Sequence, residues 1–473
     1  MTEKESKGKK LEKKLAYKKK CFWEKASKLE QKQAFKMSKE YCDFLDKGRT
    51  ERKVVEITKK ILEEKGFVEI NNHNPQNVNK LYKINRGKNI AIAKLGKKDI
   101  SHGFNLIVSH IDSPRVDLKQ VPLYEDSNTT LAMMHTHYYG GIKKYQWMSI
   151  PLAIYGVVIK ENGEKVEIAI GEEKDDPVFS FADLLIHLAD NQYKKKISEA
   201  IDAEKLILLF GSIPYPDEDM KDKIKLNCLN ILQEKYGISE EDFISAELEI
   251  VPAFPTKDVG IDRSMIGGYG HDDRICAYSS LKAILDSDED ELTSIIFFAD
   301  KEEIGSEGNT GAKSYFIQDF ISDVIDYSGL DSSKILRKVL FKSNILSADV
   351  NAAINPAFPN VHEKQNAAII GYGVCLTKFT GSRGKSSSND ANAEFISKIR
   401  NLFNTNKVVW QTGELGKVDA GGGGTIAKFM AEFGANVIDC GTPIIAMHSP
   451  FEIASKGDLF STYKAYKAFF TLI

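Results

Sequence analysis

Two adjacent glutamates, Glu302 and Glu303, are the residues of this sequence best placed to do chemistry. They come directly after the apolar run 295–299, whose β-branched and aromatic residues predict a buried strand. In a parallel sheet, ligands bind in the loop beyond the carboxyl end of a strand. There, one carboxylate can hold a metal ion while its neighbour accepts a proton from a metal-bound water. For the pair alone, the alternative is an acidic turn in solvent.

Further candidate ligands or bases stand just after other apolar runs or at the start of a predicted helix. Imidazole and carboxylate groups together suit zinc, cobalt or manganese. Each residue alone has a structural alternative, such as a core histidine, a helix cap or a turn aspartate. Their common position at strand ends favours one shared site. The set is His110, Asp112, Asp272, Asp349 and His448.

The number of candidates is large enough for two metal ions. A carboxylate has two oxygens and can bridge ions ~3.5–4 Å apart. One histidine and two carboxylates around each ion would leave one bridging carboxylate and a shared water. Asp112 lies two residues beyond His110 and could reach the far ring nitrogen, which would fix the histidine tautomer.

Length and composition limit the class of protein. The chain has 473 residues, which suits two or three domains, and its 42% hydrophobic and 28% charged residues are ordinary for a globular protein. A net charge of −2 gives no field that favours nucleic acid or membrane, and no apolar run approaches the ~20 residues of a membrane span. The six cysteines are scattered without a CxxC spacing, which fits a reducing compartment. We therefore expect a cytoplasmic protein without a nucleic-acid or membrane partner.

The pattern of predicted elements divides the chain. Strands alternate with helices before and after a central segment, which predicts a mostly parallel, doubly wound α/β sheet. Between residues 116 and 254, short alternating runs separated by Gly, Asp, Pro and Lys predict antiparallel hairpins. We therefore expect a discontinuous domain of residues 1–115 and 255–473, with residues 116–254 inserted. The Lys-rich residues 1–36 predict a solvated helix or frayed tail, with a nucleic-acid arm as the weaker alternative.

Taken together, the motifs resemble the M18 family of metalloaminopeptidases, which includes aspartyl aminopeptidase and aminopeptidase I. Their order and rough spacing match over nearly the whole chain. The resemblance implies a zinc-peptidase αβα sandwich with a β-rich dimerisation domain inserted, assembling into a dodecamer. The matching motifs are His110-x-Asp112-Ser113-Pro114, Asp272-Asp273, Asp300-x-Glu302-Glu303-Ile304-Gly305-Ser306, Ser347-Ala348-Asp349 and Met447-His448-Ser449.

The same resemblance implies a function and a role for each residue. The enzyme would hydrolyse the N-terminal residue of peptides with two Zn²⁺ ions, with Co²⁺ or Mn²⁺ as other possible metals. Glu302 would be the general base on a water that bridges the ions, and Asp112 would support it. His187, in the insert, matches a family histidine that reaches the active site of a neighbouring subunit. The implied ligands are His110 and Asp349 for one ion, Glu303 and His448 for the other, and Asp272 as the bridge.

Substrate preference stays open. Aspartyl aminopeptidases tend to follow the bridging aspartate with Asn, where this chain has Asp273. An acidic preference would require a basic side chain in the pocket, and the candidates are Lys378, Arg383 and Lys385. Gly423 and Thr425 belong to a Gly-rich run whose backbone can approach a substrate closely. Two other functions remain open, a deacylase or dipeptidase on the same metal scaffold and a catalytically silent oligomeric scaffold.

Overall fold

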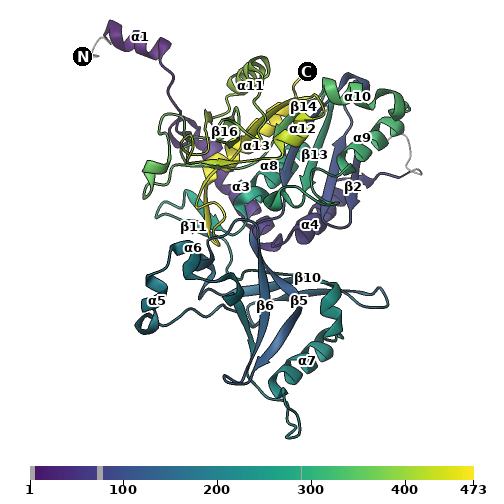
Figure 1. Cartoon of the computed structure of the whole chain (residues 1–473). Coiled ribbons are helices and arrows are strands. Elements are labelled where there is room, and N and C mark those ends of the chain that lie inside the picture. The colour runs from purple at the N-terminus through teal and green to yellow at the C-terminus, as the bar shows by residue number, and fades with distance from the viewer. Residues whose placement is uncertain (1–5, 72–77, 289) are drawn as a thin grey trace.

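The computed structural model describes residues 6–71, 78–288 and 290–473. The chain forms two lobes, with a large sheet and its helices in one and the strands β5, β6 and β10 in the other (Figure 1). The N-terminal helix α1 (Lys7–Leu15) stands away from both lobes, and none of its residues is buried. This part of the N-terminal tail is therefore the solvated helix that the sequence predicts.

A nine-stranded sheet forms the centre of the first lobe. Its four central strands, β13, β4, β14 and β20, are parallel, whereas the pairs β2–β3, β3–β13 and β20–β16 are antiparallel. The predicted mostly parallel sheet is thus confirmed, although strand β2 was not predicted. In spatial order the strands are β1 (Val68–Glu69), β2 (Lys80–Asn85), β3 (Asn89–Lys94), β13 (Thr293–Ala299), β4 (Phe104–His110), β14 (Asn344–Ser347), β20 (Asn436–Gly441), β16 (Val374–Thr377) and β18 (Trp410–Thr412).

Helices cover both faces of this sheet, which explains why its central strands β4, β13 and β14 are buried along their whole length. In β13, Ile296 and Phe298 face one helical layer, and Ile295 and Phe297 face the other. The result is the expected αβα sandwich. The first layer contains α3 (Lys28–Lys47), α4 (Glu51–Glu64), α8 (His271–Asp286), α11 (Ala393–Thr405) and α13 (Lys456–Phe470), and the second contains α9 (Phe316–Tyr327), α10 (Ser332–Lys342) and α12 (Ala427–Ala431).

The N-terminal tail packs against the first lobe from an earlier residue than the sequence predicts. Phe22, in the short helix α2 (Phe22–Lys25), is 2% exposed and packs against Phe460, with no room for a side chain at Gly457. Helix α3 then begins with a capping box in which Ser27 and Glu30 exchange hydrogen bonds. The prediction of a frayed tail is therefore wrong beyond residue 21, because one buried aromatic side chain anchors the segment.

The second lobe is a six-stranded antiparallel sheet with a hydrophobic core of its own. It spans residues 115–252, close to the predicted insert, whose role in dimerisation stays a prediction. Helix α7 (Lys223–Tyr236) packs on it, and α5 (Asp190–Tyr193) and α6 (Ile197–Ala200) lie at its other end (Figure 1). In spatial order the strands are β8 (Lys165–Ile170), β7 (Leu152–Ile159), β10 (Ala246–Pro252), β5 (Arg115–Asp126), β6 (Leu131–Tyr139) and β9 (Ile207–Gly211).

A third, five-stranded sheet holds together the chain segments next to Asp272, Asp349 and His448. It consists of β11 (Lys257–Val259), β12 (Met265–Gly268), β22 (Glu452–Ser455), β21 (Pro443–Ile445) and β15 (Asn351–Ala352). A small ladder of β17 (Gly381–Ser382) with β19 (Gly422–Gly423) fixes the Gly-rich run. Among the described residues, no helix is long and apolar enough to cross a membrane.

Candidate metal centre and active site

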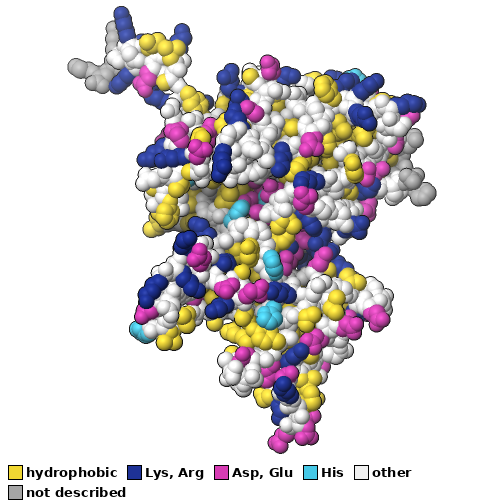
Figure 2. Space-filling view, viewed as in Figure 1, with side chains coloured by type: hydrophobic (Ala, Val, Ile, Leu, Met, Phe, Trp, Pro, Cys, Tyr) yellow, Lys and Arg dark blue, Asp and Glu magenta, His cyan; other side chains and the backbone are white. Residues whose placement is uncertain are grey.

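The parallel strands bring the predicted residues to one edge of the large sheet. His110 is the last residue of β4 and lies beside Ala299, the last residue of β13. The loop with Glu302 and Glu303 follows β13, and Asp349 follows β14 on the other side of β4. Figure 2 shows histidine and acidic side chains together at the waist between the two lobes.

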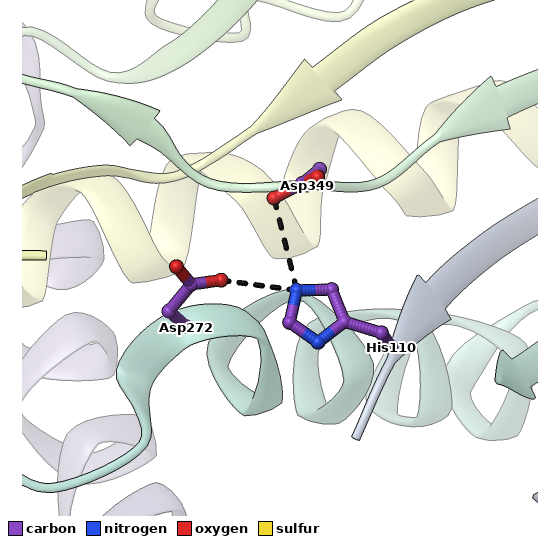
Figure 3. A group of neighbouring side chains, drawn as sticks. All are labelled: His110, Asp272 and Asp349. Carbon is purple, nitrogen blue, oxygen red and sulfur yellow. Dashed lines mark hydrogen bonds and ion pairs between the residues drawn. The ribbon is translucent and has the colours of Figure 1, made fainter. Parts of the chain in front are cut away.

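The first group of possible ligands surrounds the Nε2 atom of His110. This nitrogen lies 3.0 Å from Oδ1 of Asp272 and 4.0 Å from Oδ1 of Asp349 (Figure 3). Oε2 of Glu302 is 3.9 Å away from the same nitrogen. Three side chains from separate segments therefore converge on one imidazole.

The second group surrounds His448. Its Nε2 atom lies 3.2 Å from Oδ2 of Asp272 and 3.5 Å from Oε2 of Glu303. Asp272 thus directs one carboxylate oxygen toward each histidine. This is the arrangement that a bridging carboxylate needs.

Backbone carbonyls set the tautomer of both histidines. Nδ1 of His110 lies 3.0 Å from the backbone oxygen of Asp112, and Nδ1 of His448 lies 3.1 Å from the backbone oxygen of Gly141. Because a carbonyl oxygen only accepts, each Nδ1 must carry a proton, so in the neutral imidazole Nε2 is the nitrogen with a free electron pair. The carboxylate of Asp112 is farther from the ring, with its Oδ1 3.4 Å from Nδ1.

Asp112 holds the glutamate loop in place. Its Oδ1 accepts the N–H of Glu302 at 3.1 Å, and its Oδ2 accepts the N–H of Glu303 at 3.2 Å. The hydroxyl of Tyr139 donates to the same Oδ2 at 2.8 Å. Asp112 is fully buried, so it acts on substrate only through the residues that it positions.

The electrostatics of the cluster fit a divalent cation. Burial raises the pKa of Glu302 to about 7 and the pKa values of Glu303 and Asp349 well above their usual range, and repulsion from neighbouring carboxylates adds to this effect. Burial opposes charge on His448, but its hydrogen bond with Asp272 and the charge of Glu303 raise its pKa to about 10. Oε1 of Glu303 is buried without a hydrogen-bond partner among the described residues.

Donor distances agree with this interpretation. Three groups of side chains each offer one ligand atom, and within each group these atoms lie within 4.8 Å of one another. Imidazole with carboxylate is a donor set that zinc accepts. The groups are His110 with Asp272 and Asp349, His110 with Glu302 and Glu303, and Asp272 with Glu303 and His448.

Glu452 supports the centre and was not singled out from the sequence. Its Oε2 accepts the N–H of Asp272 at 3.0 Å, and its Oε1 accepts the N–H of His448 at 2.6 Å. The side chain is buried, which raises its pKa to about 8. A signal was available, since Glu452 stands four residues after His448 between apolar residues.

A cavity of about 390 Å³ opens beside the cluster. Asp272, Glu302, Glu303, Asp349 and His448 line one side of it, and the Gly-rich run lines another. Gly423 and Thr425, which were predicted to face substrate, both line this cavity. The cavity therefore offers space for a substrate directly against the candidate ligands.

The three predicted basic residues lie outside this cavity. Lys378 and Lys385 pair with Asp390 at 3.6 and 2.7 Å, and Arg383 and Lys385 line a separate cavity of about 50 Å³. Lys428 lines the main cavity instead, and it has no ion-pair partner in the described part of the chain. Its ammonium lies 4.7 Å from the ring centre of Phe429.

His187 lies on the surface of the second lobe. It is exposed in a 3₁₀ helix, Ile186–Leu188, and belongs to none of the ligand groups found among the described residues. Within one chain, the structure therefore does not bring His187 to the centre.

Known proteins share this fold and are similar in sequence. A family model described as aminopeptidase I zinc metalloprotease (M18) matches residues 44–470. The chain belongs to the M18 family. A Thermotoga maritima protein named "Probable M18 family aminopeptidase 1" is 51% identical over 444 residues, which cover 93% of this chain and 96% of that protein. A Clostridium acetobutylicum protein of the same name is 48% identical over 452 residues, which cover 94% of this chain and 97% of that protein.

Solved structures agree with the sequence matches. The crystal structure of an M18 aminopeptidase from Thermotoga maritima superposes with a TM-score of 0.92 at 49% identity, covering 97% of this chain and all of that chain. The S. cerevisiae mApe1 dodecamer shares the fold, with a TM-score of 0.74 at 22% identity, and the match covers 92% of this chain and 96% of that chain. The M18 protein described here is thus a hydrolase of the metalloaminopeptidase class and a zinc metallopeptidase, as the resemblance implied.

Proposed function

We propose that this M18 aminopeptidase removes the N-terminal residue of peptides with two zinc ions held at the described centre. His110 and Asp349 would hold one ion, Glu303 and His448 the other, and Asp272 both. The observation that carries this proposal is the position of Asp272, whose two oxygens lie 3.0 and 3.2 Å from Nε2 of His110 and of His448. Co²⁺ or Mn²⁺ would suit the same donors.

Glu302 is the proposed general base. Bound zinc supplies Lewis acidity, which polarises a carbonyl and lowers the pKa of water. The carboxylate of Glu302 faces the cavity, takes the proton of the attacking water and passes it to the leaving amine nitrogen. Burial raises the pKa of this carboxyl, and a raised pKa makes the carboxylate a better proton acceptor.

The acidic lining of the cavity would favour substrates with a free amino terminus. An ammonium or amine at the start of a peptide complements Glu303 and the other acidic groups that line the cavity. An acylated amino terminus has neither the charge nor the basic nitrogen for this contact. The proposal therefore predicts exopeptidase rather than endopeptidase cleavage.

A paired-substrate assay tests the proposed function. The zinc-loaded enzyme should release the first residue of an unblocked peptide and leave its N-acetylated counterpart intact, and EDTA should abolish release. Equal cleavage of both peptides would contradict the aminopeptidase proposal. Preferential cleavage of acyl-amino acids would instead indicate a deacylase on the same scaffold, and cleavage confined to dipeptides would indicate a dipeptidase.

We also propose that the insert, residues 116–254, mediates assembly into an oligomer. The S. cerevisiae mApe1, which shares the fold, is described as a dodecamer. The segment around His187 supports this proposal, because monomeric proteins rarely expose contiguous apolar side chains. Such an interface would carry His187 to the active site of a neighbouring copy. The exposed residues are Leu184, Leu185, Ile186, Leu188, Tyr193 and Ile197, which are 50–69% exposed.

Lys428 is expected to influence which first residue is preferred. It is the lysine that lines the main cavity, so a substrate carboxylate would meet its charge there. A half-buried ion pair contributes ~1 kcal/mol, so Lys428→Glu should lower the kcat/KM ratio of acidic over neutral aminoacyl substrates by about 10-fold or more. Lys378→Glu, outside the cavity, is the matched control. An unchanged ratio in Lys428→Glu would show that Lys428 does not select substrates.

A further inference from the structure

We propose that three residues of the second lobe, Tyr139, Gly140 and Gly141, position both halves of the metal centre within the same chain. We call them the positioning segment. Tyr139 is the last residue of β6 and the two glycines follow it, in the part of the chain predicted as an insert. The inference rests on the proposed metal centre and adds residues that do not themselves bind metal.

Tyr139 acts on the His110 side through Asp112. Its hydroxyl donates to Oδ2 of Asp112 at 2.8 Å, and Asp112 in turn accepts the N–H groups of Glu302 and Glu303. The backbone oxygen of Asp112 fixes Nδ1 of His110. The hydroxyl of Tyr139 therefore orients Asp112. Asp112 in turn holds both His110, a proposed ligand, and Glu302, the proposed general base.

Gly141 acts on the His448 side directly. Its carbonyl oxygen lies 3.1 Å from Nδ1 of His448, so this carbonyl keeps the ring in the tautomer that frees Nε2. His448 itself has a φ of 65°, in the left-handed region, which is unusual for a residue other than glycine. The Gly141 carbonyl contacts the ring from outside the loop that carries His448.

The two glycines allow the approach. Gly140 has a φ of 70°, and a Cβ there would lie 3.3 Å from Cβ of Glu303. A Cβ on Gly141 would lie 3.3 Å from Nδ1 of His448. Both separations are tighter than ordinary van der Waals contact, so the backbone reaches the centre because these positions lack side chains.

Arg115 anchors the segment to both lobes. It pairs with Tyr139 across β5 and β6, and its guanidinium lies 4.0 Å from the centre of the tyrosine ring. The buried guanidinium also lies 3.1 Å from Glu249 in the second lobe and 3.8 Å from Glu51 at the start of α4 in the first. The placement of the second lobe is thus linked to the geometry of the metal centre.

Two variants test the two contacts separately. Tyr139→Phe removes only the hydroxyl, and Tyr138→Phe, at an exposed neighbouring tyrosine, is its control. Partners of this kind alter metal affinity by about 10- to 100-fold, so Tyr139→Phe should weaken zinc binding by that factor in competition with a chromophoric chelator. It should lower kcat with little change in KM, because Glu302 is displaced while the cavity wall remains.

Gly141→Ala should weaken the binding of the zinc ion beside His448. One zinc ion per chain should then be lost at a chelator concentration at which wild type retains both. Circular dichroism and light scattering establish that each variant is folded and assembled as wild type. If Tyr139→Phe and Gly141→Ala both match Tyr138→Phe in zinc affinity and kcat, the inference is wrong. If wild type itself binds fewer than two zinc ions, the proposed centre fails instead, and the two failures are thereby distinguished.

Discussion

Replacing Glu302 by Gln is expected to lower kcat by about 10²–10⁴-fold while the protein keeps its zinc. Gln preserves the size of the side chain and its place in the cavity wall, but it cannot accept a proton. Because Asp112 binds the backbone N–H of residue 302, the loop should stay in position. Steady-state kinetics on an unblocked peptide, together with metal analysis of the same sample, measure both quantities.

Glu307→Gln is the matched control for this variant. Glu307 belongs to the same loop after β13, but it is exposed and pairs with Lys313. It should retain wild-type activity. Full activity of Glu302→Gln would remove Glu302 from the mechanism, whereas inactivity with loss of zinc would make Glu302 a ligand.

Replacing Asp272 by Asn is expected to cost both zinc affinity and activity. Asp272 directs separate oxygens toward His110 and His448, and an amide offers one acceptor oxygen where the carboxylate offers two. Loss of a residue that hydrogen-bonds to a metal ligand already lowers metal affinity by about 10- to 100-fold. Loss of Asp272, which would bind both ions, should lower zinc affinity further. Metal content after dialysis should fall from two zinc ions per chain to one or fewer.

Asp286→Asn provides the comparison, since Asp286 ends the same helix and interacts with Lys282 and Tyr463. It should bind two zinc ions with wild-type affinity. Two tightly bound zinc ions in Asp272→Asn would show that the carboxylate does not bridge. A melting curve recorded for each variant with zinc separates loss of metal from loss of fold.

Local sequence patterns predicted much of the fold and the residues that gather at the candidate metal centre. Short apolar runs predict strands wherever the residues that flank them are charged or Gly-rich. β13 and β4 were found in this way, and their parallel pairing places Glu302 and His110 at one edge. The side chains of Asp272, Asp349 and His448 come to the same edge. Their assignment as metal ligands remains a prediction that the Asp272 variant tests.

Other features depend on contacts between distant parts of the chain. Phe22 looks like part of a solvated tail, but it packs on α13, more than four hundred residues later. Lys378 and Lys385 were placed on the substrate side, but Asp390 pairs with both. Charge and hydrophobicity in sequence do not predict these partners, because each partner depends on how helices and loops pack.

By itself, the sequence determined the chemical groups and the strand ends that carry them, because strand propensity and turn chemistry are local properties of the chain. Tertiary structure alone decided which groups hold the centre in place. Glu452 joins Asp272 to His448, and Tyr139 and Gly141 reach across from the other lobe. The contacts of Glu452 and Gly141 involve backbone N–H or carbonyl groups, which are common to nearly all residues and become specific only when folding brings them within hydrogen-bonding distance of a partner.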